Sequence, residues 1–285
     1  MSHKINIAVT ELPVICGMNP YENIKKTIVK HWKSLDLEMY NSMLKAGFDK
    51  PLTNNSEKIE HYTKKYKLDT LSADANNCSS ATNTKDLQKS KNDMISKIEA
   101  DINIPANEKE DIKRQIDSLV YTRYGSRKES DAIDIYSETY GVKVVGKQKC
   151  IKKLFSSGGN VNWYIIGKLD GLTEDGSTII EIKNRTKALF KMVVDYEKIQ
   201  MMTYMKLFQK QKCNLVECLD SPKGKMLNVI ELQYDENFWN IIDLGLARYV
   251  KFMAKFMGNQ NEMTNLLTAT DDAYQKYYLD CVSKL

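Results

Sequence analysis

The chain has 285 residues, of which 42% are hydrophobic and 28% charged, and its formal net charge is +5. This balance excludes a disordered low-complexity chain, and the length suits one large domain or two small ones. No apolar run approaches the roughly 20 residues of a membrane span. Six scattered cysteines favour a reducing, intracellular compartment over a disulfide framework. The opening, Met1 to Lys4, leads into an amphipathic stretch rather than a secretory signal.

The N-terminal part, residues 1–119, is predicted to be mainly helical. Apolar positions over residues 5–48 indicate helices, and residues 87–122 indicate two more, interrupted at Pro105. Residues 69–86 are polar and rich in turn formers, which predicts a flexible loop.

A further helix is expected over residues 126–140, closed by Gly141. Glu129 falls in line with its apolar stripe, which consists of Ala132, Ile133, Tyr136 and Tyr140. A carboxylate that points inward is costly unless it meets a cation, a metal or hydrogen bonds, so Glu129 is a candidate site residue. The alternative is a glutamate placed at the helix start because the helix dipole favours it there.

The next residues predict strands near 142–153, 161–171 and 177–183. Asp175-Gly176 lies between the last two and is a strong signal for a hairpin turn. The first strand begins with a match to the phosphate-binding pattern G-x-x-x-x-G-K, but Gln148 stands where that pattern needs Ser or Thr. An ATP-binding loop is therefore not expected.

The hairpin would bring two carboxylates and one ammonium together. Glu181 and Lys183 are two residues apart on one strand, so both side chains leave the same face, and the fold-back brings Asp170 close to them. Clustered carboxylates suit Mg²⁺ or Mn²⁺, which activate a bound water and bind phosphate oxygens. A neighbouring lysine can orient that water, or accept its proton if its pKa is lowered. The alternative is an exposed hairpin with ordinary surface charges.

A helix over residues 190–210 follows, with Gln200 and Tyr204 four residues apart beside its apolar stripe. These two polar side chains could point at the end of the preceding strand, or could be incidental on a core helix. A later strand at 226–232 precedes C-terminal helices over residues 236–285. The expected fold is a single α/β domain, residues 1–285, with a core at about 120–235 in which helices flank a mixed central sheet.

The order and spacing of these residues resemble the PD-(D/E)xK nuclease superfamily. The closest likeness is to the branch of phage lambda exonuclease, YqaJ-type viral recombinases and RecB-like nucleases. The match runs from about residue 8 to about residue 208. It rests on Gly125…Glu129, Asp170-Gly171, Glu181-Ile182-Lys183, Gln200…Tyr204 and an opening segment from Ala8 to Tyr21. The resemblance implies a restriction-endonuclease-like core and a nuclease that uses Mg²⁺ or Mn²⁺.

The resemblance also implies roles for individual residues. Asp170, Glu181 and the backbone carbonyl of Ile182 would ligate the metal, and Lys183 would position or activate the attacking water. Glu129 would reach a second ion or its waters.

Further residues would face the nucleic acid. Gln200 and Tyr204 would contact the scissile strand or hold the lysine, and Thr10 would lie near the DNA phosphates. Arg185 could reach a phosphate or pair with a surface acid. Where lambda exonuclease uses an arginine near the N-terminus for the terminal 5′-phosphate, this chain has only His3 and Lys4.

The function expected from the resemblance is hydrolysis of linear double-stranded DNA from the 5′ to the 3′ end, in recombination, repair or defence, with a viral origin. Expected partners are DNA, further copies of the chain, and a strand-annealing or helicase protein; no membrane is expected. One alternative keeps the chemistry but acts as an endonuclease or on single strands. Another is a catalytically inactive module for DNA binding or protein contact.

Overall fold

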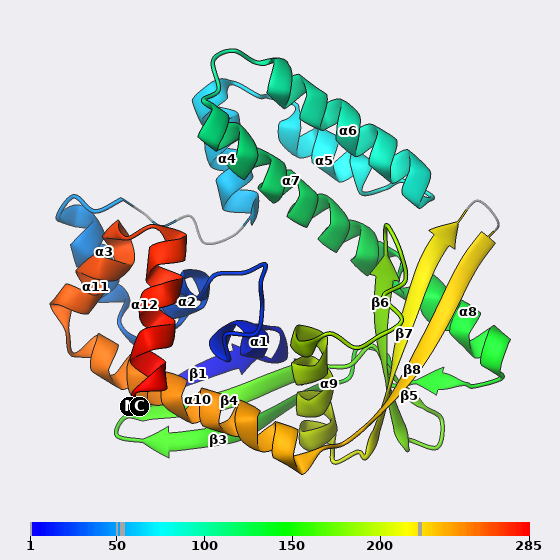
Figure 1. The fold of residues 1–285 in the computed structure, drawn as a ribbon. Helices are drawn as coiled ribbons and strands as arrows, with labels where there is room; N and C mark the ends of the chain where they lie inside the picture. The colour runs from blue at the N-terminus through cyan, green and yellow to red at the C-terminus, as the bar shows by residue number, and fades with distance from the viewer. Residues whose placement is uncertain (1, 50, 52–54, 222–223) are drawn as a thin grey trace.

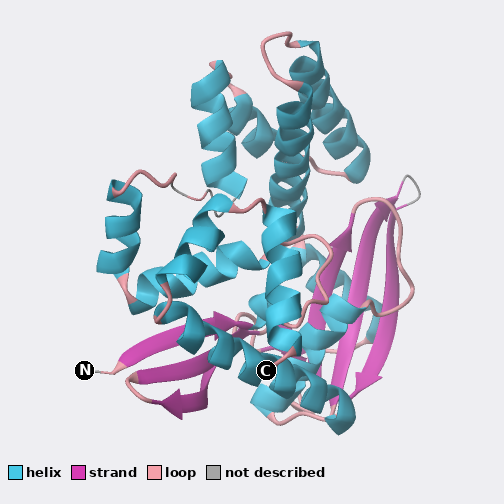
Figure 2. Cartoon of the chain, turned by 60° about the vertical axis from the view of Figure 1, so that its left-hand side comes forward, coloured by secondary structure: helices cyan, strands magenta, loops and turns pink. Residues whose placement is uncertain are grey.

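The computed structural model describes residues 2–49, 51, 55–221 and 224–285. It confirms the α/β class, with mixed sheets flanked by helices (Figure 1). The strands form two hydrogen-bonded sheets rather than one, and Figure 2 shows them as separate magenta groups with helices packed between and above them. Among the described residues, no helix is both long and apolar enough to cross a membrane.

The first sheet has the order β1-β4-β3. Its strands are β1 (His3–Ala8), β4 (Val161–Lys168) and β3 (Cys150–Gly158). β1 runs parallel to β4, and β3 runs antiparallel to it. The prediction of helix from residue 5 was wrong here, because Ile5 and Ile7 are buried while their neighbours point outward, which is the period of a strand.

The second sheet has the order β2-β5-β6-β7-β8. Its strands are β2 (Val144–Val145), β5 (Gly171–Thr173), β6 (Thr178–Arg185), β7 (Lys212–Ser221) and β8 (Gly224–Gln233). β5 and β6 form the predicted hairpin, with Gly176 at φ +66° in its turn. β7 was not predicted: it is a central strand, and its nearly continuous buried run lacks the alternation that marks a half-exposed strand.

The two sheets meet at a bend between β4 and β5. The predicted strand 161–171 breaks at Leu169 and Asp170, and the strand 142–153 breaks between β2 and β3. Two backbone bonds tie the breaks together, from Gln148 N to Leu169 O (2.9 Å) and from Leu169 N to Lys149 O (3.0 Å). Asp170 is therefore fixed where the ribbon passes from one sheet to the other.

Helices cover both sheets. The main core lies between the first sheet and a group of N- and C-terminal helices, and buries Trp32, Tyr249, Phe256 and Tyr278. These helices are α1 (Leu12–Ile15), α2 (Ile24–Leu35), α3 (Leu37–Lys45), α10 (Glu236–Met257), α11 (Gln260–Thr268) and α12 (Asp271–Ser283), with the 3-10 turn η1 (Val9–Glu11) before them. α9 (Asp195–Phe208) links the parallel strands β6 and β7, and α8 (Glu129–Tyr140) packs on β6.

A second helical group has its own core (Figure 1). It comprises α4 (Asn55–Tyr66), α5 (Leu71–Cys78), α6 (Thr84–Ala100) and α7 (Ala106–Arg127). The predicted break at Pro105 is confirmed, but the predicted loop at 69–86 contains α5. Leu71, Ala75 and Cys78 are spaced by four and three residues, so they bury one helical face within an otherwise polar sequence.

The bend leaves no room for a side chain at Gly171, because a Cβ there would lie 2.3 Å from Val144 Cγ1. We expect Gly171→Ala to lower the free energy of unfolding by about 1–3 kcal/mol through overpacking, measured by urea denaturation. Gly158→Ala, which meets nothing within 4 Å, is the matched control and should change little. Adding Val144→Ala to Gly171→Ala should restore part of the loss; no recovery would place the strain elsewhere.

Candidate active site

The structure brings the three central predicted residues together at the bend. Glu181 and Lys183 leave the same face of β6, and Lys183 Nζ lies 2.7 Å from Glu181 Oε1. Gly171 pairs with Ile180, which places Asp170 beside Glu181, and the backbone N–H of Ile182 donates to Asp170 Oδ2 at 2.8 Å. The hairpin thus provides two carboxylates and one ammonium from adjoining strands.

α9 supplies the two predicted polar residues. Gln200 Oε1 accepts a hydrogen bond from Lys183 Nζ at 3.3 Å. Tyr204 is buried, and its ring lies on Gly167 of β4, where an added Cβ would come within 3.1 Å of Tyr204 Cε1. The helix begins at Asp195 rather than at the predicted residue 190, so the residues between β6 and α9 form a loop.

Glu129 approaches from the other side, at the first turn of α8. Gln148 Nε2 donates to Glu129 Oε1 at 2.6 Å, and Glu129 lies close enough to Asp170 to affect its ionisation. Ala132, Ile133 and Tyr136 are buried as predicted, but Tyr140 at the helix end is half exposed.

Burial and like charge make the carboxylates hard to ionise. Burial, together with the charge of Glu129, raises the pKa of Asp170 to about 6. Burial also raises the pKa of Glu181 to about 7, with Asp170 contributing and Lys183 opposing. Burial likewise opposes a charge on Lys183, but the two carboxylates outweigh it and raise the pKa of its ammonium above the usual value. In this structure Lys183 Nζ donates hydrogen bonds to Glu181 Oε1 and Gln200 Oε1.

The donor chemistry of this cluster fits a hard divalent cation. Glu181 Oε2 is buried and has no hydrogen-bond partner, which is costly for a carboxylate unless a cation completes it. Within the described ranges, no three His, Cys, Asp or Glu side chains already surround one point as a finished metal site. Glu181 Oε1 accepts from Lys183 and Glu129 Oε1 from Gln148, so one oxygen of each carboxylate is already engaged.

The three residues predicted to contact DNA are placed differently from one another. Thr10 is exposed on η1, just past the end of β1, and β1 runs parallel to β4 toward the bend that carries Asp170. Lys4 pairs with Asn162 at the opposite end of β4, about 25 Å from Asp170 along the strand. A contact between Lys4 and DNA stays a prediction, and it would have to form at this distance from the carboxylates.

Arg185 does not extend toward solvent. Its Nε donates to Glu217 Oε1 at 2.7 Å, and Nη1 and Nη2 donate to the two Glu197 oxygens at 2.7 and 3.0 Å. The guanidinium pairs with acids, the second of the two predicted alternatives, although these acids are buried rather than on the surface. Sequence reasoning missed both acids; Glu197 lies one helical turn before Gln200, whereas Glu217 belongs to the unpredicted strand β7.

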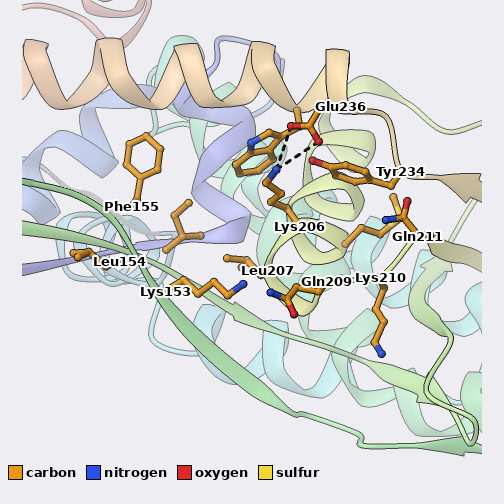
Figure 3. A pocket seen from close by; sticks show the side chains of 13 residues that line it. Lys153, Leu154, Phe155, Lys206, Leu207, Gln209, Lys210, Gln211, Tyr234 and Glu236 are labelled. Atoms are coloured by element: carbon orange, nitrogen blue, oxygen red, sulfur yellow. Dashed lines mark hydrogen bonds and ion pairs between the residues drawn. The ribbon is translucent and has the colours of Figure 1, made fainter.

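One cavity in the described part of the structure lies away from these residues. It has a volume of about 480 Å³ and is bordered by β3, the C-terminal end of α9 and the start of α10, with Lys206, Tyr234, Glu236 and Trp239 among its lining (Figure 3). Lys206 pairs with Glu236 at 3.2 Å and lies over the ring of Trp239. None of the predicted catalytic side chains lines it.

Comparison with known proteins finds only distant likenesses. No family model and no curated protein matches the chain. Similar solved structures include the protein SSO0001 (18% identity, TM-score 0.35, covering 49% of this chain) and a phage-related exonuclease from Haemophilus somnus 129PT (17%, 0.37, covering 48% of this chain and 72% of that one). Another is an alkaline exonuclease, LHK-Exo, from Laribacter hongkongensis (16%, 0.39, covering 68% and 93%). The chain spans 62% of SSO0001.

The crowded carboxylates predict a particular dependence of stability on pH in the metal-free protein. Because the pKa of Asp170 is about 6 when folded and 3.8 ordinarily, the folded state binds a proton between these values that the unfolded state does not. Stability should fall as the pH rises through this window. Asp170→Asn keeps an acceptor for Ile182 N–H and removes the charge, so it should raise the free energy of unfolding by about 1–3 kcal/mol near pH 8.

The measurement is urea denaturation in EDTA across that pH range. The gain from Asp170→Asn should shrink toward zero below pH ~4. Asp243→Asn, which makes the same change at an exposed position on α10, should show no such profile. If the difference in free energy of unfolding between the wild type and Asp170→Asn did not change with pH, the pKa of Asp170 would not be raised in the folded state.

Proposed function

We propose that the protein is a nuclease that uses Mg²⁺ or Mn²⁺ to hydrolyse phosphodiester bonds in DNA. The observation that carries the proposal is the crowding of Asp170 and Glu181 beside the ammonium of Lys183, with one buried carboxylate oxygen left without a partner. A structural ion pair would satisfy its charges, whereas this cluster has an excess of buried acid that a cation would relieve. Preference for the ends of linear duplexes, 5′ to 3′ polarity and a role in recombination rest on the sequence resemblance.

The residues would divide the work as follows. Asp170, Glu181 and the carbonyl of Ile182 would hold the cation, and Glu129 would hold a second ion or its waters. When bound, the cation would acidify a water and stabilise the charge that develops on the phosphate. Lys183 would donate a hydrogen bond to the attacking water or to a phosphate oxygen, and Gln200 would hold the ammonium in place. Tyr204 would fix the distance between α9 and β4 through its contact with Gly167.

The test is a time course on 5′-labelled linear duplex and on closed circular DNA, with Mg²⁺, with Mn²⁺ and with EDTA. We expect metal-dependent degradation of linear DNA and no cleavage of circles. Asp170→Asn should abolish this activity, and Asp243→Asn should keep it. Cleavage of circles would indicate an endonuclease. A labelled single strand of the same sequence, run beside them, would be cut faster than the duplex by a single-strand nuclease. Binding without cleavage under every condition would contradict the proposal and favour a DNA-binding module.

Substitutions of Asp170, Glu181 and Lys183 should affect cleavage but not DNA binding. We expect Asp170→Ala, Glu181→Ala and Lys183→Ala each to lower the cleavage rate at least ~100-fold, because each removes charge at the reacting phosphate. DNA affinity in EDTA, measured by fluorescence anisotropy, should change little. Glu129→Gln should have a smaller effect and Tyr204→Phe the smallest. A single variant that cleaves at the wild-type rate would remove that residue from the mechanism.

Metal binding should also be visible without any substrate. A cation that completes Asp170 and Glu181 stabilises only the folded state, so Mn²⁺ should raise the melting temperature of the wild type by several degrees near pH 8. Asp170→Asn should lose most of this shift, and Asp243→Asn should keep it. Equal shifts in all three proteins would place the bound ion elsewhere.

A further inference from the structure

A second cluster of buried charges lies directly beside the proposed catalytic one. Arg185 follows Lys183 by two residues, so it leaves the same face of β6 about 7 Å further along. Its side chain is only 10% exposed, and its partners Glu197 and Glu217 are buried. This cluster has two acids for one base, and backbone amides supply the remaining donors.

Glu217 uses those donors to hold the loop between β6 and α9. Its Oε1 accepts from Phe190 N at 3.0 Å and its Oε2 from Lys191 N at 2.9 Å, while Asn228 Nδ2 donates to Oε2 at 2.9 Å. Burial would raise the pKa of Glu217, but these amides and Arg185 together hold it below its usual value. Lys191 sits at φ +57°, a conformation that a lysine adopts only when its surroundings impose it. The buried acid is therefore what keeps this loop in shape.

The loop is held in a conformation that exposes large apolar side chains to water. Phe190 is 45% exposed and Met192 60% exposed. One face of the Phe190 ring lies on the Arg185 guanidinium, 4.0 Å from its centre. Lys187 and Lys191 are exposed on the same loop. The surface thus places a partly exposed aromatic ring between positively charged side chains.

A second exposed aromatic lies over the start of α9. Tyr21, 78% exposed, packs edge-on against Tyr196 with ring centres 5.7 Å apart. Tyr196 precedes Gln200 by one helical turn, on the same face of α9. Exposed aromatics therefore approach the proposed cleavage site both from the loop after β6 and from the loop after α1.

We propose that the loop at residues 186–194, with Phe190 as its main contact, is a stacking platform for unpaired nucleobases of the strand being cut. Every base has a π-face, so an open aromatic ring backed by a guanidinium binds bases without regard to sequence, and nearby lysines follow the phosphates. The substrate class rests on the proposed nuclease function. Arg185 and Glu217 are positioning residues in this arrangement, since they act on the bases only through Phe190 and the loop.

Binding in EDTA tests the platform separately from cleavage. The probes are a single-stranded oligonucleotide of about a dozen nucleotides and an abasic oligomer with the same number of phosphates. Phe190→Ala should weaken binding of the base-containing probe by roughly 5- to 100-fold and leave the abasic probe unaffected. Phe190→Trp should retain affinity. Tyr140→Ala, which removes a similarly exposed aromatic at the end of α8, should affect neither probe.

Equal losses on both probes would mean that Phe190 matters only for folding or phosphate contact, and no loss on either would also overturn the platform. If the protein were a dimer that the Phe190→Ala substitution dissociates, and DNA binding were unchanged, this surface would instead bind a second copy of the chain. Glu217→Gln should cause an intermediate loss of affinity for the base-containing probe, provided that its unfolding transition remains cooperative. If this variant does not fold, the comparison of Phe190→Ala with Phe190→Trp still tests the platform.

The cleavage assay distinguishes the two proposals. Base-dependent binding through Phe190 without any metal-dependent cleavage would leave the platform standing and remove the nuclease. Cleavage that depends on Asp170, together with no base-dependent effect of Phe190→Ala, would support the nuclease and remove the stacking platform.

Discussion

The candidate active site depends on the burial of carboxylates at the bend between two sheets. Asp170 and Glu181 lie where β4 turns into β5 and meets β6, and burial raises the pKa of both. Lys183 compensates only part of this charge, since Glu181 Oε2 remains without a partner. Such an arrangement costs stability, and the surrounding fold tolerates it because the bend is fixed by backbone hydrogen bonds and by close packing at Gly171.

One βαβ unit carries both charge clusters. β6 presents Lys183 and Arg185 from the same face, and α9 places Gln200 opposite the first and Glu197 opposite the second. The parallel strand β7 then supplies Glu217 beneath the loop that joins β6 to α9. Because the connecting helix must pack back on the sheet, a short run of sequence is enough to place the proposed catalytic side chains and the loop beside them in fixed register.

Local pattern predicted the parts of the site that are close in sequence. The turn at Asp175-Gly176 places Asp170 beside Glu181, and helical spacing places Gln200 and Tyr204 on adjoining turns of α9. Local sequence pattern failed where the hydrogen-bond or ion-pair partner of a residue lies on a strand distant in the sequence. The pairing of Arg185 could not be resolved because Glu217 lies on β7, whose buried run has no alternation. Strand β1 was missed because its two buried positions, Ile5 and Ile7, are too few to show a strand or its direction.

The two clusters show how buried charge of different purpose can be told apart. Around Arg185, each acid meets the guanidinium, and backbone amides complete Glu217, whose pKa is lowered despite its burial. Around Lys183 the acids exceed their donors, and their pKa values are raised. A satisfied cluster holds the structure in place, whereas an unsatisfied one is poised to bind something positive. Arg185 and Lys183, two residues apart on one strand, are alike in sequence, and only the balance of donors and acceptors around them distinguishes the satisfied cluster from the one proposed to bind a cation.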